Sequence, residues 1–467
     1  MPINSFIYPS QVKLLDYEVA NSCRFNDDDS AYMDITPGSA GNRKTWTFSA
    51  WVKRGNLGLN TAFFESRVSA DVMSYIAFAT GDAIRFYTNV SGVADYGYLS
   101  DALFRDISAW YHIIVVIDTT QGTASNRAKL YVNGVQQSFD QQYGDLPEDH
   151  ESHINTTDSH RIGYNLNEGF YLDGYLAEVC FIDGQALTPT SFGEFDEDSP
   201  TIWKPIDVSG LTFGTNGFYL DFEDSADLGA DVSGNSNDFT VNNLAATDQC
   251  TDTPTNNFAT LNGLHQVDDW SLAQGNLEFT NNSTGHRITN SNIAASQGKW
   301  YAEVKVDTLG GNYPAIGVIN PDVFLYNTYL GNSGRGYGYL SSGSTQFNDS
   351  TTSFDNTYTT GDIIGVAMDL DNHKLYFSKN GTFQDSGDPT SGATGTGSAY
   401  NLATSVSYSF AQSSYDGGTD PVYSWNFGNP PFSISSGNAD ADGHGNFEYA
   451  VPSGYYALCT KNLAEYG

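Results

Sequence analysis

Short stretches in which apolar and polar residues alternate recur along almost the whole chain. Thr45–Lys53, Trp110–Asp118 and Ile363–Leu370 alternate or are continuously apolar, and clusters of Gly, Asn, Asp or Pro bound them. Alternation places successive side chains on opposite faces of a strand. The helical pattern is confined to a short stretch at Pro189–Glu194. The chain is therefore predicted to consist of strands joined by tight turns, with almost no long helices.

Turn residues separate these stretches at the spacing of β-hairpins. Asp371-Asn372-His373 joins Ile363–Leu370 to Lys374–Ser378, and Asn380-Gly381 closes the far end. Asn133-Gly134 follows another apolar stretch in the same way. Because type I′ turns need positive φ at both central residues, Asn-Gly is a strong hairpin indication.

The composition agrees with a strand-rich fold and limits the classes of partner that are expected. Aromatic residues make up 14% of the chain, with 30 Tyr, 28 Phe and 47 Gly. The 20 Lys and Arg against 55 Asp and Glu give a formal net charge of −35. Such a surface repels nucleic acid and anionic membranes, so neither is expected as a partner. The acidic residues are scattered, which favours a solubility adaptation over an acidic binding tail.

The cysteines and the N-terminus carry little chemistry. The four cysteines form no CxxC pair, and Cys180 lies in an apolar strand pattern, so a buried free thiol is predicted there. No stretch approaches the ~20 apolar residues of a membrane span, and the N-terminus lacks a secretory apolar run. We expect a protein that is used without classical secretion or membrane insertion; the alternative is that a leader has been removed.

The C-terminal part resembles a known domain family. Gly361–Phe383 matches a hallmark hairpin of the SPRY (B30.2) domain nearly residue for residue. Lys299–Val306 (KWYAEVKV), Ala315–Ile319 (AIGVI) and Tyr423–Phe427 (YSWNF) follow the order of that family. The resemblance implies a β-sandwich that binds partners and catalyses nothing.

The N-terminal part resembles the laminin-G-like, concanavalin A-like lectin/glucanase superfamily. The matching pieces are CRFNDDDSAYMDI, TWTFSAWVKR, WYHIIVVID, KLYVNGV and FYLDGYLAEVCFIDGQALTP. Gly217–Val241 resembles the strand and loop that usually open such a domain, but here it follows the last strand. We expect it to fold back as a permuted edge strand; the alternative is a partly ordered connector carrying one strand.

These resemblances define the expected architecture. The fold class is all-β, with two antiparallel β-sandwich (jelly-roll) domains joined by an Asn/Asp-rich segment. The expected divisions are an N-terminal docking segment at 1–21, a laminin-G-like/concanavalin A-like sandwich at 22–205, a connecting segment at 206–264 and a SPRY-like sandwich at 265–467.

Catalytic patterns are missing from the sequence. Retaining glycosidases of the concanavalin A-like superfamily use Glu-x-Asp-x-x-Glu on one strand face, whereas Asp173, Glu178 and Asp183 are spaced by five. No Gly-x-Ser-x-Gly elbow or phosphate-binding loop occurs. His150, His153 and His160 are predicted to lie in a solvated loop, not to hold a metal. No enzyme activity is expected.

Calcium is the cofactor for which the sequence offers ligands, although none is required. Laminin-G-like folds often bind this cation near a sheet rim, and it prefers carboxylate and carbonyl oxygens. The alternative is that these acids build turns. The candidate ligands are Asp27, Asp28, Asp29, Asp221, Asp224 and Asp231.

Exposed aromatic side chains are the candidates for ligand recognition, because they stack on sugars and anchor protein interfaces. The alternative is that they are ordinary half-buried strand residues, and Tyr337 and Tyr339, which alternate with Gly, fit one strand face. The candidates crowd the SPRY-like loops: Tyr313, Tyr326, Tyr329, Tyr337 and Tyr339.

The combination of two such modules resembles structural proteins of environmental bacteriophages. We therefore expect a virion protein, assembled in the host cytoplasm, that serves as a tail fibre, knob or capsid decoration. Its expected partners are other virion proteins, copies of itself in a homo-oligomer, and a host-surface glycan or protein receptor. The alternative is a secreted or cell-surface carbohydrate-binding adhesin of a bacterium.

Overall fold

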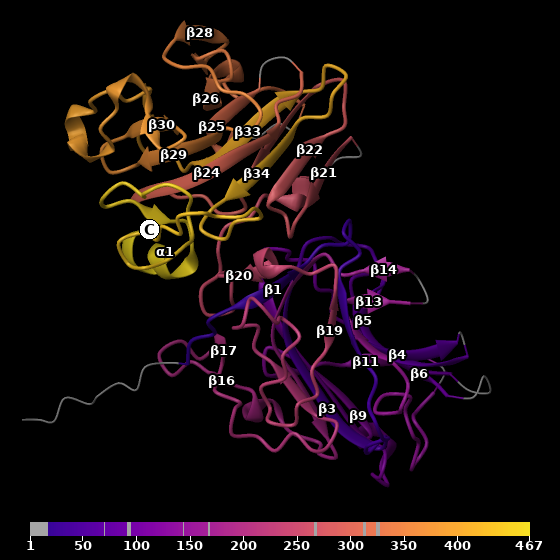
Figure 1. Cartoon of the computed structure of the whole chain (residues 1–467). Helices are drawn as coiled ribbons and strands as arrows, with labels where there is room; N and C mark the ends of the chain where they lie inside the picture. Colours follow the sequence, from indigo (N-terminus) through magenta and orange to yellow (C-terminus); the bar gives the residue numbers. More distant parts are fainter. Residues whose placement is uncertain are drawn as a thin grey trace, which may run out of the picture.

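Two β-sandwiches follow one another along the chain. The computed structural model describes residues 17–69, 71–90, 95–142, 144–166, 169–265, 269–311, 314–323 and 327–467. In Figure 1 the indigo and magenta strands form one lobe, and the orange and yellow strands form the other. The predicted all-β fold class is confirmed.

Two sheets face one another in the first sandwich. Within the described residues one sheet has eight strands, with β18 pairing beside the main path: β10 (Val135–Gln136), β9 (Ala128–Val132), β8 (Trp110–Asp118), β3 (Thr45–Arg54), β15 (Gly174–Asp183), β1 (Ser22–Phe25), β20 (Gln249–Cys250) and β18 (Phe218–Leu220). The facing sheet comprises β11 (Phe139–Gln142), β7 (Asp95–Ser100), β6 (Ile84–Asn89), β5 (Val72–Phe78), β4 (Thr61–Ser69), β12 (His160–Ile162), β2 (Tyr32–Ile35) and β19 (Thr240–Asn242).

The second sandwich is built in the same way. One sheet comprises β21 (Trp270–Ala273), β22 (Glu278–Asn281), β34 (Val422–Asn426), β24 (Lys299–Thr308), β29 (Ile363–Asp369), β30 (Lys374–Lys379) and β31 (Thr382–Phe383), with β32 (Tyr400–Asn401) and β35 (Tyr456–Ala457) at its side. The other comprises β23 (His286–Asn290), β33 (Ser409–Tyr415), β25 (Ala315–Ile319), β26 (Gly336–Leu340), β27 (Ser344–Phe347) and β28 (Ser350–Ser353).

The remaining elements are short. Two ribbons pair β13 (Tyr164–Asn165) with β14 (Phe170–Tyr171) and β16 (Gly193–Phe195) with β17 (Trp203–Pro205). In the described part of the chain the α-helical residues are those of α1 (Thr460–Tyr466). The predicted helical stretch after Thr188 is a 3₁₀ turn at Pro189–Ser191. Further 3₁₀ turns span Ala124–Asn126, Ala246–Asp248, Gly263–His265, Pro321–Val323, Asn332–Gly334, Gln384–Ser386 and Pro389–Thr394.

The predicted hairpin turns have the backbone that their residues favour. Asn380 and Gly381 have φ of 48° and 78°, and Asn133 and Gly134 have φ of 49° and 75°. Positive φ at both central residues is the type I′ geometry, which matches the right-handed twist of the flanking strands. The hairpin prediction is therefore confirmed at both positions.

A β-bulge in β15 makes room for a late strand. The pairing of β15 with β3 shifts register between Ala177 and Cys180, and Glu178 there has φ of 51°. Before the bulge β15 pairs with β1, and after it β15 pairs with β18. The segment expected to fold back thus adds β18 to one sheet and β19 to the other.

Each sandwich has its own core between its sheets. Trp46, Phe48 and Phe64 lie in the first core together with Phe218 and Phe239 of the fold-back segment. The second core includes buried Trp300 and Trp425. The four cysteines are buried free thiols, as predicted for Cys180. None of the helices in the described ranges is long and apolar enough to cross a membrane.

Candidate functional site at the junction of the sandwiches

The aromatic residues expected to bind a ligand are mostly packed inside the second sandwich. Tyr339 is fully buried and Tyr337 nearly so, as one face of β26, and both belong to the core. Tyr329 is half-buried, and its hydroxyl donates to Asp349 Oδ1 at 2.6 Å. Tyr313 and Tyr326 lie outside the described residues. The burial of Tyr337 and Tyr339 leaves little ring surface for a ligand.

The acids of the fold-back segment, named as calcium candidates, build turns. Asp231 accepts hydrogen bonds from the backbone of Tyr219 and Ser233 through Oδ1 and from Asn237 through Oδ2. Asp221 and Asp224 each accept from the backbone two residues ahead, as in Asx turns.

The acids of the first turn contact the second sandwich. Asp29 Oδ2 accepts from Asn26 and from Gln274 of the β21–β22 turn, and Asp27 accepts from Asn56. Asp28 is exposed. Among the described residues, no three His, Cys, Asp or Glu side chains stand close enough to hold a metal ion.

The histidines expected in a solvated loop are instead packed against the protein, so that prediction is wrong. His153 and His160 are buried, and His150 is half-buried. His160 Nε2 accepts from the Asn155 backbone at 2.8 Å, and burial lowers the pKa of His160 to about 4. The polar residues around these histidines concealed the fact that the segment lies on the sheet through β12.

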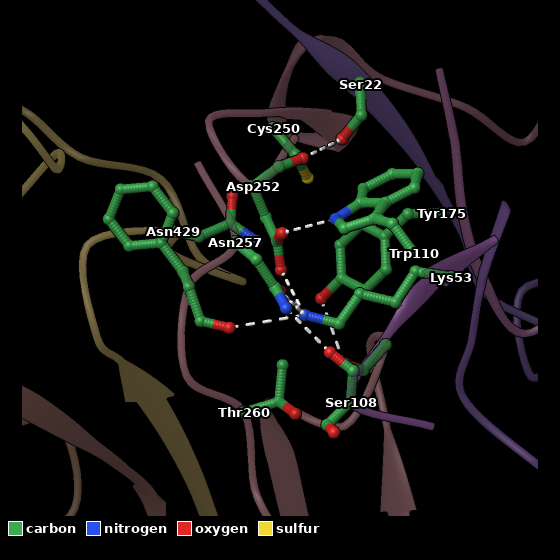
Figure 2. Close-up of polar contacts among 12 residues, drawn as sticks. Ser22, Lys53, Ser108, Trp110, Tyr175, Cys250, Asp252, Asn257, Thr260 and Asn429 are labelled. Carbon is green, nitrogen blue, oxygen red and sulfur yellow. Dashed lines mark hydrogen bonds and ion pairs between the residues drawn. The ribbon is translucent and has the colours of Figure 1, made fainter. Parts of the chain in front are cut away.

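A buried polar network joins the two sandwiches. Lys53 Nζ lies 2.6 Å from Asp252 Oδ2, with the two side chains 1% and 0% exposed. Lys53 also donates to Asn257 Oδ1 at 2.7 Å and to the Phe258 carbonyl at 3.2 Å. Trp110 Nε1 donates to Asp252 Oδ1 at 2.9 Å. Figure 2 shows these side chains converging from β3, β8 and the segment between the sandwiches.

Further contacts bridge the same junction. Arg24 of β1 donates to the Pro430 carbonyl at 3.2 Å and to the Thr247 carbonyl at 2.9 Å. The Tyr175 hydroxyl donates to the Gly275 carbonyl at 2.9 Å. Gly275 has φ of 61°, and a Cβ there would lie 2.4 Å from the Tyr175 ring, so both conformation and space require glycine. The sandwiches are therefore tied by buried, charge-assisted contacts.

An open groove lies beside this network, and we call it the junction groove. Its volume is about 320 Å³. Phe432 contributes an aromatic ring, and Lys305 Nζ lies 5.6 Å from the centroid of that ring. The lining comes from both sides of the junction: Ser225, Ala246, Thr247, Gln249 and Thr251, and Asn429, Pro430, Phe432, Ser433, Ile434 and Asn446.

The junction groove has the chemistry of a binding site. Its lining consists of hydroxyl, amide and apolar side chains and includes no charged one, although the chain carries 55 acids. The nearby Cys250 thiol is buried, and burial raises its pKa to about 11, so it is a poor nucleophile. Neutral donors and acceptors beside an aromatic ring suit a neutral polar ligand.

Sequence reasoning missed the junction. Lys53 ends an apolar strand pattern and looks like an ordinary exposed lysine, whereas its partner Asp252 is 199 residues away. Asp252 itself lies in an Asn/Asp-rich stretch typical of turns. No local pattern distinguishes a buried acid from a solvated one there.

The two sandwiches and the junction groove define a protein of binding-type folds. Comparison with protein families agrees: residues 27–191 match the Concanavalin A-like lectin/glucanases superfamily, and residues 299–413 match the SPRY domain. The chain therefore carries a concanavalin A-like domain and a SPRY domain, as both resemblances predicted.

Individual relatives are distant. The chain is 30% identical over 120 residues to a Ran-binding proteins 9/10 homolog of Drosophila melanogaster, covering 24% of this chain but 12% of that protein. The SPRY domain of human HERC1 is 14% identical with a TM-score of 0.26, covering 32% of this chain and 87% of that one. A Bacteroides ovatus protein described as carbohydrate binding is 14% identical with a TM-score of 0.30, covering 48% and 59%.

Proposed function

We propose that this chain is a non-catalytic recognition protein of a bacteriophage particle, a tail fibre, knob or capsid decoration. In this proposal the junction groove contacts a glycan or protein of the host surface. One observation carries the recognition role: both sandwiches, each of a binding-type fold, line one neutral groove beside a buried network that ties them together. The phage placement rests on the resemblance of the combined modules to structural proteins of environmental bacteriophages. A fixed groove lowers the ordering cost of binding.

The carboxylates of β15 and of Asp173, just before it, support a non-catalytic role. The Glu178 carboxylate accepts hydrogen bonds from the hydroxyls of Tyr17 and Tyr219. Asp183 is held by Asn42 and Asn155 at the far end of the ten-residue strand. Asp173 is buried at the junction. Glycoside hydrolysis needs two carboxyl groups roughly 5–10 Å apart around one bond. Because a strand rises about 3.3 Å per residue, these three carboxylates, spaced by five residues, are too far apart to form such a pair.

Peptide mass spectrometry of gradient-purified phage particles tests the placement. Recovery of this chain in fixed ratio to capsid and tail proteins is the expected result. Its absence from particles, together with its presence in a bacterial cell-surface fraction, would contradict the placement on a virion. That result would favour the alternative, a bacterial adhesin. Release of new reducing ends from any member of a polysaccharide panel would contradict the non-catalytic role.

A further inference from the structure

Lys129 differs from the other lysines of the described residues. Among the described residues the Lys129 ammonium has neither an ion-pair partner nor a hydrogen-bond partner, although the chain carries 55 acidic residues against 20 basic ones. Each of the other described lysines has a polar partner: Lys44, Lys53, Lys204, Lys299, Lys305, Lys374, Lys379 and Lys461. An unpaired cation in so acidic a protein needs an explanation.

The register of two strands places Lys129 on the outer face of the first sandwich. Leu130 and Val132 of β9 belong to the core, so Lys129 and Tyr131 point the other way. Lys129 lies opposite Val116 of β8. Lys129 and Tyr131 are both half-buried, so they are partly enclosed and not fully solvated.

A groove of about 280 Å³ surrounds these side chains, and we call it the Lys129 groove. Asp118, Gln121 and Asn126 contribute polar groups, and Val116, Ala186, Leu187 and Thr188 complete the lining with Lys129 and Tyr131. The volume lies just below the roughly 300–1,000 Å³ of typical small-molecule sites, which suits a ligand of one or two sugar rings.

The polar groups of the Lys129 groove fall into two kinds. Among the described residues, the Tyr131 hydroxyl and the Asn126 side-chain amide have no hydrogen-bond partner, and both are free to bind a ligand. Asp118 is already oriented, because Thr120 Oγ1 and Gln121 Nε2 each donate to it at 2.6 Å. Burial acts to raise the pKa of Asp118, but these hydrogen bonds outweigh it and hold that pKa below its ordinary value.

We propose that the Lys129 groove binds an acidic sugar, with the sugar carboxylate on the Lys129 ammonium and ring hydroxyls on Asn126, Tyr131 and Asp118. A carboxylate needs a cation, and ring hydroxyls need donors as well as acceptors. Leu187 and Val116 offer an apolar floor to the C–H face of the ring. A phosphate dianion fits less well, because the lining holds one cation and an anionic Asp118.

This inference goes beyond the proposed function, because the Lys129 groove lies on the first sandwich alone and takes a charged ligand. It also holds whichever surface carries the protein. A failure to find the chain in phage particles leaves it intact, and a failure of acidic sugars to bind leaves the virion placement intact.

Isothermal titration of the full chain with D-galacturonate, D-glucuronate and N-acetylneuraminate, and with the methyl ester of each, tests the proposal. We expect at least one acid to bind saturably at one site. The affinity of its methyl ester should be lower by about tenfold or more, because the ester lacks the charge-assisted contact. Added salt should weaken binding of the acid more than binding of the ester, because salt screens the charge-assisted contact. Binding by none of the acids, equal binding of acid and ester, or equally tight binding of inorganic phosphate would overturn the proposal.

Matched variants locate the site. Lys129→Met keeps the aliphatic stem and should lose affinity for the acid about tenfold or more, whereas Tyr131→Phe should lose a few-fold. Lys374→Met makes the same charge change on the second sandwich and should bind as the unaltered chain does. Unchanged affinity in Lys129→Met, or an equal loss in Lys374→Met, would overturn the assignment. Thermal unfolding of each variant verifies that it is folded.

Discussion

The two sandwiches bury a carboxylate in different ways. Asp252, at the junction, is fully buried against the cation of Lys53. Glu303, in β24 of the second sandwich, is also 0% exposed but has four neutral donors: the backbone amides of Glu448 and Tyr449, the Asn426 amide and the Tyr301 hydroxyl.

The difference shows what each acid does. Neutral donors from one sandwich satisfy Glu303 locally, and burial still raises its pKa to about 7. Asp252 needs a cation from a strand about 200 residues earlier, so its pairing ties distant segments together. A buried ion pair adds little net stability, but removing one partner is costly. We therefore expect the junction to be sensitive to a single charge change.

The largest effect is expected from Lys53→Met. The variant leaves the Asp252 carboxylate buried without its cation, which should lower the free energy of unfolding by about 3–5 kcal/mol. Thermal and denaturant unfolding measure the loss. Adding Asp252→Asn to Lys53→Met should restore part of it, because the uncompensated charge is gone. Lys374→Met, on the surface of the second sandwich, is the control and should change the free energy of unfolding by less than about 0.5 kcal/mol. An equally small loss in Lys53→Met would show that the Lys53–Asp252 ion pair does not matter for stability.

The effect of Glu303 is expected in the pH dependence of the free energy of unfolding. Because burial raises its folded-state pKa from 4.5 to about 7, the protonated form is favoured in the folded state. Its contribution to stability is fully present below pH 4.5 and is lost as pH rises through 7, by about 3 kcal/mol in all. Glu303→Gln should flatten the fall in unfolding free energy between these pH values. The exposed Glu194→Gln should not, and an unchanged slope in Glu303→Gln would contradict the shift.

Gly275→Ala tests the junction through shape and not charge. The substitution forces positive φ on alanine and places Cβ against the Tyr175 ring, and should cost about 1–2 kcal/mol or more. Gly361→Ala is the matched control, since Gly361 also has positive φ but nothing within 4 Å of its Cβ. The excess loss in Gly275→Ala, measured by denaturant unfolding, reports the contact between the sandwiches. Equal losses would mean that this contact contributes nothing.

Sequence patterns predicted most of this architecture, because strands and turns are local. β8 and β25 begin and end at the predicted residues, and both Asn-Gly turns have the predicted backbone. β4 was missed because Thr61–Ser69 mixes apolar, charged and hydroxyl residues without alternation, and it carries two irregularities in its pairing with β5. The site was missed for another reason. Lys53 and Asp252 meet only through tertiary pairing, and Lys129 and Asp118 line one groove only because β8 pairs with β9.

The smallest effect on stability is expected from Phe432→Ala. This variant is also the most direct test of the junction groove. The ring is half-buried, so its loss should lower the free energy of unfolding by about 1 kcal/mol or less. Because the ring would stack on a bound ligand, binding of the purified chain to host cells, followed by flow cytometry, should fall about tenfold. Phe347→Ala removes an exposed ring that stacks on Tyr337 in the second sandwich and does not line the groove, and should leave binding unchanged. If Phe347→Ala weakened binding and Phe432→Ala did not, the ligand would bind the SPRY sheet and not the junction groove. The second sandwich would then act as a separate binding module, without a groove shared with the first.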